Sequence, residues 1–98
     1  MTDQTLTMTA RITEKLRSAL SPERLEIINE SHLHAGHQEA FDGTGETHFR
    51  VRIVAGAFSG MPRLQRHRTI NDLLEAELHD GVHALAIEPA APGESIRW

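Results

Sequence analysis

The stretch that decides the fold is the clearest strand pattern in the chain, His48-Phe49-Arg50-Val51-Arg52-Ile53-Val54-Ala55. Apolar side chains at positions 49, 51 and 53 alternate with arginines at positions 50 and 52. Successive side chains of a strand point to opposite faces, so this alternation predicts one buried and one solvent-facing surface. Gly60 and Pro62 mark the turn that follows this strand.

The segments on either side of this strand predict the other elements. Apolar residues recur at helical spacing from Met8 to Leu20, and Pro22 ends that helix because the residue before a proline avoids the helical conformation. Residues 25–30 and 82–88 predict two further strands. A second helix is predicted over residues 62–78, with a buried stripe formed by Leu64, Ile70, Leu74 and Leu78.

The order of these elements predicts a two-layer α+β domain. The connection from the second strand through the second helix to the third strand is long enough for a right-handed crossover, so these two strands are expected to be parallel. The first two strands can pair antiparallel. The result is an α-β-β-α-β order, with a three-stranded mixed sheet and both helices on one face. We expect this domain at residues 8–88, between a disordered N-terminus at 1–7 and a short C-terminal tail at 89–98.

The composition narrows the classes of function. A chain of 98 residues has room for one domain, and its formal charge of −4 argues weakly against nucleic-acid binding driven by bulk charge. It contains no cysteine, so it forms no disulfide and supplies no thiolate to a metal. No signal-peptide pattern is present, and no apolar run approaches the roughly 20 residues of a membrane span. We therefore expect a soluble, cytoplasmic protein.

Several stretches, in order along most of the chain, resemble the BolA family. They are Leu25-Glu26-Ile27, Asn29-Glu30-Ser31, Gly45-Glu46-Thr47-His48-Phe49-Arg50-Val51, Phe58-Ser59-Gly60, Arg66-His67-Arg68 and Val82-His83-Ala84-Leu85-Ala86-Ile87. The loop over residues 29–37 is similar to the histidine version of the family's variable ligand loop, as in bacterial relatives of the histidine-loop type. The resemblance implies a fold similar to the type II KH domain. It also implies two activities: pairing with a monothiol glutaredoxin around a 2Fe–2S cluster, and binding DNA as a regulator of stress response and cell morphology.

The histidines are the candidate metal ligands, because neutral imidazole binds iron, zinc and copper. Loop histidines are more often simply solvated, but the resemblance implies that His34 is the loop's cluster ligand, with His37 as the alternative. Strand alternation places His83 on the face of Leu85 and Ile87, where a half-buried histidine bonded to a backbone carbonyl is the simplest interpretation. The resemblance implies instead that His83 matches the family's invariant cluster ligand.

The remaining candidates lie on the second predicted helix. His67 lies on its apolar stripe, so we expect a structural core histidine with one bonded nitrogen. Arg63, Arg66 and Arg68 surround the start of the helix and form a possible DNA phosphate-contacting patch. The alternative is a solvated helix face whose arginines pair with Asp72, Glu75 or Glu77.

These observations favour an adaptor over an enzyme. The chain contains no nucleophile elbow and no Gly-rich phosphate loop. A 2Fe–2S cluster needs four protein-type ligands, of which a chain without cysteine offers only imidazoles. We therefore expect a non-enzymatic adaptor, a monomer or weak homodimer that binds no cofactor alone. A monothiol glutaredoxin, with its cysteine and bound glutathione, would bring the thiolates. The alternative is a DNA-binding transcriptional regulator.

Overall fold

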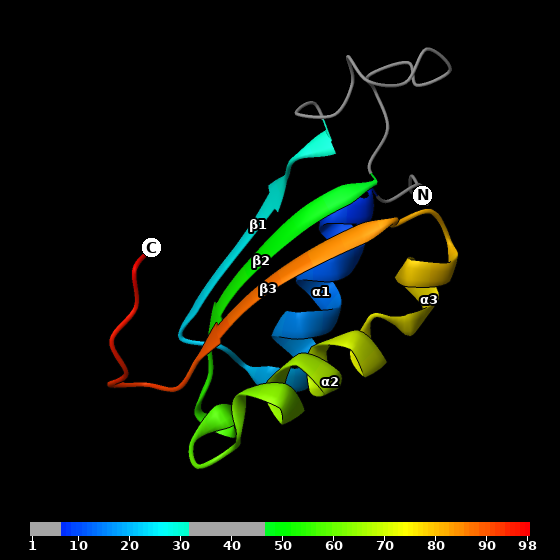
Figure 1. Cartoon of the computed structure of the whole chain (residues 1–98). Coiled ribbons are helices and arrows are strands. Elements are labelled where there is room, and N and C mark those ends of the chain that lie inside the picture. The colour runs from blue at the N-terminus through cyan, green and yellow to red at the C-terminus, as the bar shows by residue number, and fades with distance from the viewer. Residues whose placement is uncertain (1–6, 32–46) are drawn as a thin grey trace.

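The computed structural model describes residues 7–31 and 47–98. The elements follow one another as α1 (Met8–Leu20), β1 (Arg24–Asn29), β2 (His48–Val54), the short 3-10 helix η2 (Gly56–Phe58), α2 (Arg63–Leu73), α3 (Glu75–His79) and β3 (Ala84–Ala90). Helices α1, α2 and α3 lie on the same side of the sheet (Figure 1). The predicted two-layer α+β architecture is confirmed.

The sheet has the predicted mixed topology. Its strand order is β1-β2-β3, so β2 is central and the other two strands are edges. Strand β2 pairs antiparallel with β1, where Ile27 lies opposite Val51. It pairs parallel with β3, where Val51 lies opposite Ile87. The parallel pair requires the crossover that α2 and α3 provide.

The hydrophobic core lies between the sheet and the helices. The alternation of β2 buries Phe49, Val51 and Ile53, as predicted. Full burial of one aliphatic side chain contributes about 1.5–3 kcal/mol, so the stripe of β2 is a major part of the stabilisation. The other elements contribute the remaining fully buried large apolar side chains, which are Ile12, Leu16, Phe58, Ile70 and Leu74.

The second predicted helix differs from the structure in two respects. It is two helices, because Leu74 adopts φ −103° and ψ 19° and interrupts the helical backbone between α2 and α3. Its buried side is formed by Arg66, Ile70 and Leu74, which repeat at intervals of four. Leu64 lies off that stripe and is 64% exposed, so its predicted burial was wrong.

The boundaries of the domain also shift. Thr7 caps α1 by accepting a hydrogen bond from the Ala10 amide at 3.0 Å, so it belongs to the fold, while residues 1–6 lie outside the described residues. Strand β3 begins at Ala84 and continues through Pro89 to Ala90, two residues beyond the predicted end of the domain. Within residues 7–31 and 47–98, no helix is long and apolar enough to cross a membrane.

Candidate functional site

Ser31 organises the end of the sheet at which β1 finishes and β2 begins. Its side chain is almost completely buried, and its hydroxyl oxygen accepts hydrogen bonds from the Thr47 amide at 2.9 Å and the His48 amide at 3.1 Å. The Ser31 amide in turn donates to Asn29 Oδ1 at 2.9 Å. The two residues that flank segment 32–46, Ser31 and Thr47, are therefore bonded to each other.

His83 lies at this same end, immediately before β3. Its backbone amide donates to the Thr47 carbonyl at 2.7 Å, and the next amide, that of Ala84, donates to the same carbonyl at 3.1 Å. In a regular strand, successive amides point in opposite directions, so two successive amides on one carbonyl interrupt the alternation. The prediction that His83 shares a face with Leu85 and Ile87 is therefore wrong. The His83 side chain is exposed rather than half-buried.

The His83 ring is placed beside a second imidazole. The ring centroids of His83 and His48 are 6.4 Å apart, with an interplanar angle of 64°. The Nδ1 atom of His48 lies 2.7 Å from the Thr47 hydroxyl oxygen. Within the described part of the chain, no hydrogen bond or ion pair occupies the His83 ring, which leaves it accessible to a ligand or a partner.

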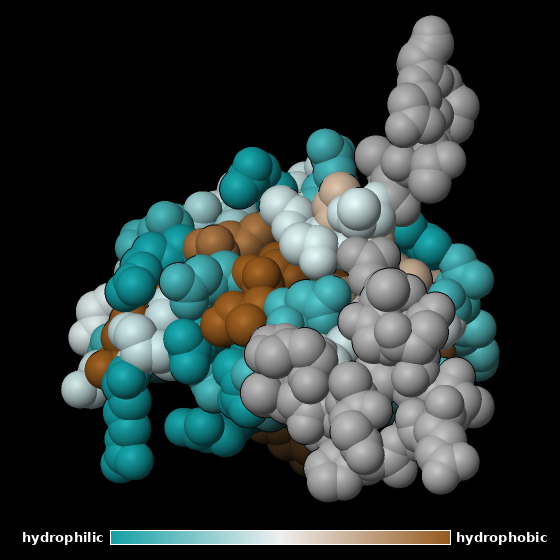
Figure 2. All heavy atoms as spheres, turned by 90° about the horizontal axis from the view of Figure 1, so that it is seen from above, coloured by the Kyte–Doolittle hydropathy of each residue, from teal (hydrophilic) through white to brown (hydrophobic). Residues whose placement is uncertain are grey.

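The surface at this end of the molecule is chemically mixed. Figure 2 looks down on it and shows hydrophobic residues gathered in a short band among hydrophilic ones.

The predicted loop ligands His34 and His37 lie outside the described residues, so their roles stay predictions. Ser31 and Thr47, the described residues on either side of positions 32–46, both lie at the end of the sheet that carries His83. Among residues 7–31 and 47–98, no group of three or more His, Cys, Asp or Glu side chains gathers where it could hold a metal ion.

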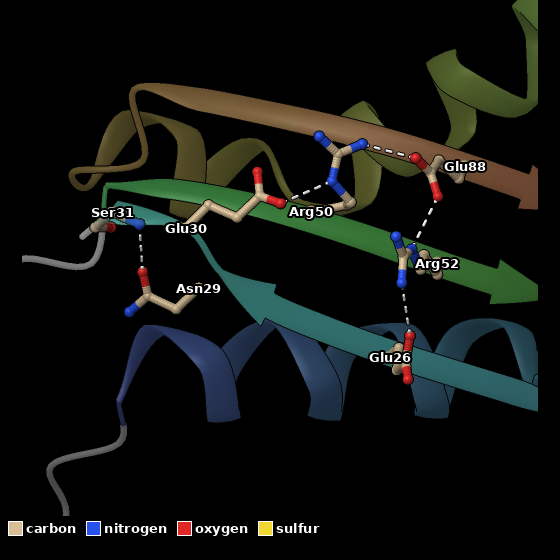
Figure 3. Close-up of polar contacts among 7 residues, drawn as sticks. All are labelled: Glu26, Asn29, Glu30, Ser31, Arg50, Arg52 and Glu88. Atoms are coloured by element: carbon tan, nitrogen blue, oxygen red, sulfur yellow. Dashed lines mark hydrogen bonds and ion pairs between the residues drawn. The ribbon is translucent and has the colours of Figure 1, made fainter. Parts of the chain in front are cut away.

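The face of the sheet opposite the helices carries a row of ion pairs (Figure 3). Arg50 contacts Glu30 at 2.8 Å and Glu88 at 2.6 Å, while Arg52 contacts Glu88 at 3.0 Å and Glu26 at 3.4 Å. Hydrogen bonds to Glu30 and then to Glu88 raise the pKa of Arg50 above its ordinary value. These arginines of β2 are therefore engaged within the molecule.

Arg66 is engaged more completely still. Its Nε donates to the Met61 carbonyl at 2.8 Å, and its two terminal nitrogens donate to the two carboxylate oxygens of Glu94 at 2.7 and 2.8 Å. We call Arg66 and Glu94 the tail anchor, because Glu94 belongs to the segment after β3. The hydrogen bonds from Arg66, followed by that from the Ala91 amide, lower the pKa of Glu94 to about 2.

The tail anchor corrects the predicted arginine patch. Arg66 is buried and its guanidinium is used internally, so it is not available to contact a DNA phosphate. Arg63 and Arg68 are exposed, and within the described residues neither forms an ion pair. The alternative prediction, pairing with Asp72, Glu75 or Glu77, is also wrong for Arg66, because its acidic partner comes from the tail.

Glu77 is a buried carboxylate that the sequence pattern did not single out. It accepts from Lys15 Nζ at 2.9 Å and from Arg11 Nε at 3.3 Å, so it ties α3 to α1. Burial by itself would raise the pKa of Glu77, but hydrogen bonds led by that from Lys15 bring the pKa below its ordinary value. Its position just before the end of a predicted helix carried no local signal of burial.

His67 lies in the wall of a cleft rather than in the core. It is half-buried, and the cleft of about 600 Å³ runs between α2, β3 and the tail, with Arg63 and Trp98 among its lining residues. The bonded ring nitrogen that we expected is not found among the described residues. The structural role of His67 therefore stays a prediction.

The fold and the histidine define a class of protein: a small α+β domain with a mixed sheet that presents an imidazole at one end. Residues 16–94 match the family described as BolA-like protein, and the chain belongs to this family. It is 64% identical to an uncharacterized protein in the cobS 5′ region of Sinorhizobium sp., over 95% of this chain and all of the relative. It is 49% identical to mouse BolA-like protein 1, over 87% of this chain and 58% of the relative.

A solved structure supports the same family. The BolA domain of SufE1 from Arabidopsis thaliana superposes with a TM-score of 0.81 and 45% sequence identity. The match covers 93% of this chain and 99% of that domain. The similarity therefore includes the whole α+β domain, with the sheet end that carries His83.

Proposed function

We propose that this protein is a non-enzymatic adaptor that pairs with a monothiol glutaredoxin and co-ligates a 2Fe–2S cluster, with His83 as its principal ligand. The observation that carries the proposal is the position of His83. Its backbone is fixed to Thr47, while its ring is exposed and makes no described hydrogen bond. A ring held in this way needs no rearrangement of the fold to bind a metal.

The ligand chemistry supports a shared site. This chain has no cysteine, so its contribution is limited to imidazoles, from His83 and from His34 or His37. The partner's cysteine and glutathione would complete the four ligands, in a mixed set similar to that of Rieske centres, whose histidines raise the reduction potential. Protonated imidazole does not bind metal, so such a cluster is pH-sensitive and suited to transfer or sensing.

The test is anaerobic reconstitution of the purified chain together with a monothiol glutaredoxin, glutathione, iron and sulfide. We expect a coloured heterodimer whose absorption and circular dichroism spectra differ from those of the glutaredoxin alone. The His83→Ala variant should lose this signature, while the His67→Ala variant should retain it. A colourless mixture without association contradicts the proposal, and unchanged spectra with His83→Ala contradict the ligand assignment.

DNA binding is the second candidate, and it rests on Arg63 and Arg68, which remain exposed on α2. It is the weaker candidate because Arg66 is buried in the tail anchor and the arginines of β2 are held in the row of ion pairs. A salt series separates the two functions. Affinity for DNA should fall steeply between 50 and 200 mM salt, the range over which phosphate contacts lose most of their strength. A cluster-dependent heterodimer should persist there.

A further inference from the structure

The outer edge of β1 differs from the outer edge of β3. Both strands are edges of the sheet, and no helix or strand of residues 7–31 and 47–98 lies beyond β1 on its outer side (Figure 1). An exposed edge offers a row of backbone N–H and C=O groups to another strand.

The hydrogen bonds of the sheet identify the outward-facing residues. The Glu30 amide donates to the His48 carbonyl at 2.7 Å, which fixes residues 24, 26, 28 and 30 as those whose backbone groups face β2. The direction alternates along a strand, so the backbone groups of Leu25, Ile27 and Asn29 face outward. No other described residue forms a backbone hydrogen bond with these three.

The outer edge of β3 is protected by a proline. The Ala90 carbonyl accepts from the Ala55 amide at 3.0 Å, so even-numbered residues of β3 face β2 and odd-numbered residues face outward. Pro89 is one of these outward residues, and it has no N–H to offer to another strand. Proline on an edge strand is a common protection against edge-to-edge pairing. Strand β1, whose sequence is Arg-Leu-Glu-Ile-Ile-Asn, contains no proline, so each of its outward-facing residues has a backbone N–H to offer.

We propose that the outer edge of β1 is a homodimerisation surface, on which a second copy of this chain pairs antiparallel about a two-fold axis at Ile27. This register pairs the strand over its full length: Ile27 meets Ile27 of the other copy, and Leu25 meets Asn29. All of these are outward-facing residues, as an antiparallel hydrogen-bonded pair requires. The two sheets become one continuous sheet, with the helices of both copies on one side.

Charge complementarity selects this occupant. In this register Arg24 lies opposite Glu30 of the other copy, and two-fold symmetry repeats the pair at the other end of the interface. Both side chains belong to the even-numbered set, which projects on the face opposite the helices together with Glu26. Arg24 and Glu30 of the other copy would form a non-hydrogen-bonded pair, the kind of pair in an antiparallel ladder whose side chains lie closest together. A pair of opposite charges there stabilises the interface, and a pair of like charges destabilises it.

Arg24 is available at the rim of this edge. Its side chain is exposed, and its guanidinium carbon lies 4.7 Å from the centroid of the Trp98 ring. Glu30 is held by Arg50 at 2.8 Å, which fixes the carboxylate near the opposite end of the strand. The dimer is independent of the cluster proposed above, because its contacts involve none of the predicted ligands.

Charge reversal tests the interface by sedimentation equilibrium over protein concentrations from micromolar to millimolar. The unmodified chain should dimerise with rising concentration, and Arg24→Glu should weaken dimerisation by about tenfold, because it creates two like-charge contacts. Glu30→Arg should also weaken it. An equimolar mixture of the two variants should restore association as a heterodimer, because each faces its opposite charge. Arg68→Glu is the matched control, since it makes the same charge change on α2.

Amide hydrogen exchange locates the contact. Protection of Leu25, Ile27 and Asn29 should rise with protein concentration, while that of Leu85 and Ile87 on the outer edge of β3 should stay constant. A chain that remains monomeric at millimolar concentration overturns the proposal. So does a dimer that responds equally to Arg24→Glu and Arg68→Glu, or that protects β3 instead. Equal melting temperatures of these two variants exclude misfolding as the cause of a difference.

Discussion

The two ends of the sheet use their polar residues differently. At the end where β2 and β3 finish, the tail anchor engages Arg66 with both oxygens of Glu94. At the other end, Ser31 and Thr47 engage backbone amides, and the His83 ring is left exposed. At one end an ion pair, Arg66 with Glu94, binds the C-terminal tail to α2. At the other end a backbone hydrogen bond to Thr47 positions His83, whose side chain stays exposed.

This difference separates residues that stabilise the fold from residues available to a partner. Arg66 belongs to a motif that suggested phosphate binding, yet its hydrogen bonds are all made within the chain. His83 makes its described hydrogen bond through the backbone alone, so removal of its ring should cost the fold little. Substitutions at the two ends should therefore affect different measurements.

The largest effect is expected for His83→Ala. We predict a loss of cluster affinity in the heterodimer of at least about 100-fold, since substitutions in the outer shell of a metal site alone cost 10–100-fold. The free energy of unfolding should change by less than about 0.5 kcal/mol, as is usual for exposed side chains. Titration of the anaerobic heterodimer with a chelator, beside urea unfolding of the free chain, measures both. Severe destabilisation of His83→Ala would contradict the view that the His83 ring contributes little to the stability of the fold.

Arg66→Ala should show the opposite behaviour. It removes the bidentate pair with Glu94 and the bond to the Met61 carbonyl, and we expect a loss of about 2–3 kcal/mol in unfolding free energy. Cluster assembly at temperatures where the variant is folded should be unchanged. Arg68→Ala is the matched control and should cost less than about 0.5 kcal/mol. Equal losses for the two arginines in urea titrations would contradict the role of the tail anchor.

Ser31→Ala should affect both measurements to a smaller extent. It leaves the amides of Thr47 and His48 without their side-chain acceptor, at a cost of about 1–2 kcal/mol. Because Thr47 also accepts from His83, we expect cluster affinity to fall by about tenfold, as for supporting residues of metal sites. Ser59→Ala on the exposed turn is the control. A fall in cluster affinity that only matches the fraction of unfolded protein would contradict the role of Ser31 in positioning His83 through Thr47.

The pH dependence of the tail anchor should be a smaller effect. The folded-state pKa of Glu94, about 2, is lower than that of an unfolded glutamate, about 4.3. Its stabilising effect is therefore fully present above the unfolded pKa and is lost as pH falls through about 4 toward 2. Thermal unfolding of the unmodified chain and Glu94→Gln should differ at pH 6 and converge near pH 2. A difference that persists at pH 2 would show that the carboxylate charge is not its source.

Local patterns predicted the strands and the first helix well. The alternation over residues 49–53 reports burial directly, and Pro22 marks the end of α1 through the backbone preference of the residue before it. The capping role of Thr7 was not predicted, because residues 1–7 were expected to be disordered. The break at Leu74 was missed because neither glycine nor proline marks it, and the packing of α2 and α3 is decided by tertiary contacts. Element order then predicted the parallel pairing correctly, because the crossover rule depends on connection length and handedness.

The candidate site was only partly predictable, for a related physical reason. The family motifs singled out His83 as a candidate ligand, but they do not show that the Thr47 carbonyl accepts two successive amides beside its exposed ring. The burial of Arg66 depends on Glu94, a residue of the tail after β3, and no helical periodicity contains that information. Long-range partners decided both outcomes, and a single sequence does not display them.

The parallel pairing of β2 with β3 also bears on when the site exists. The two strands are neighbours in the sheet but are separated in the chain by α2 and α3, so a long stretch of chain must be ordered before they meet. The bond from His83 to Thr47 belongs to that pairing and forms with it. Among the described strands β3 is the last in the sequence, so Thr47 is synthesised well before the His83 amide that it binds. The backbone of His83 is therefore fixed in place only once β3 has joined the sheet.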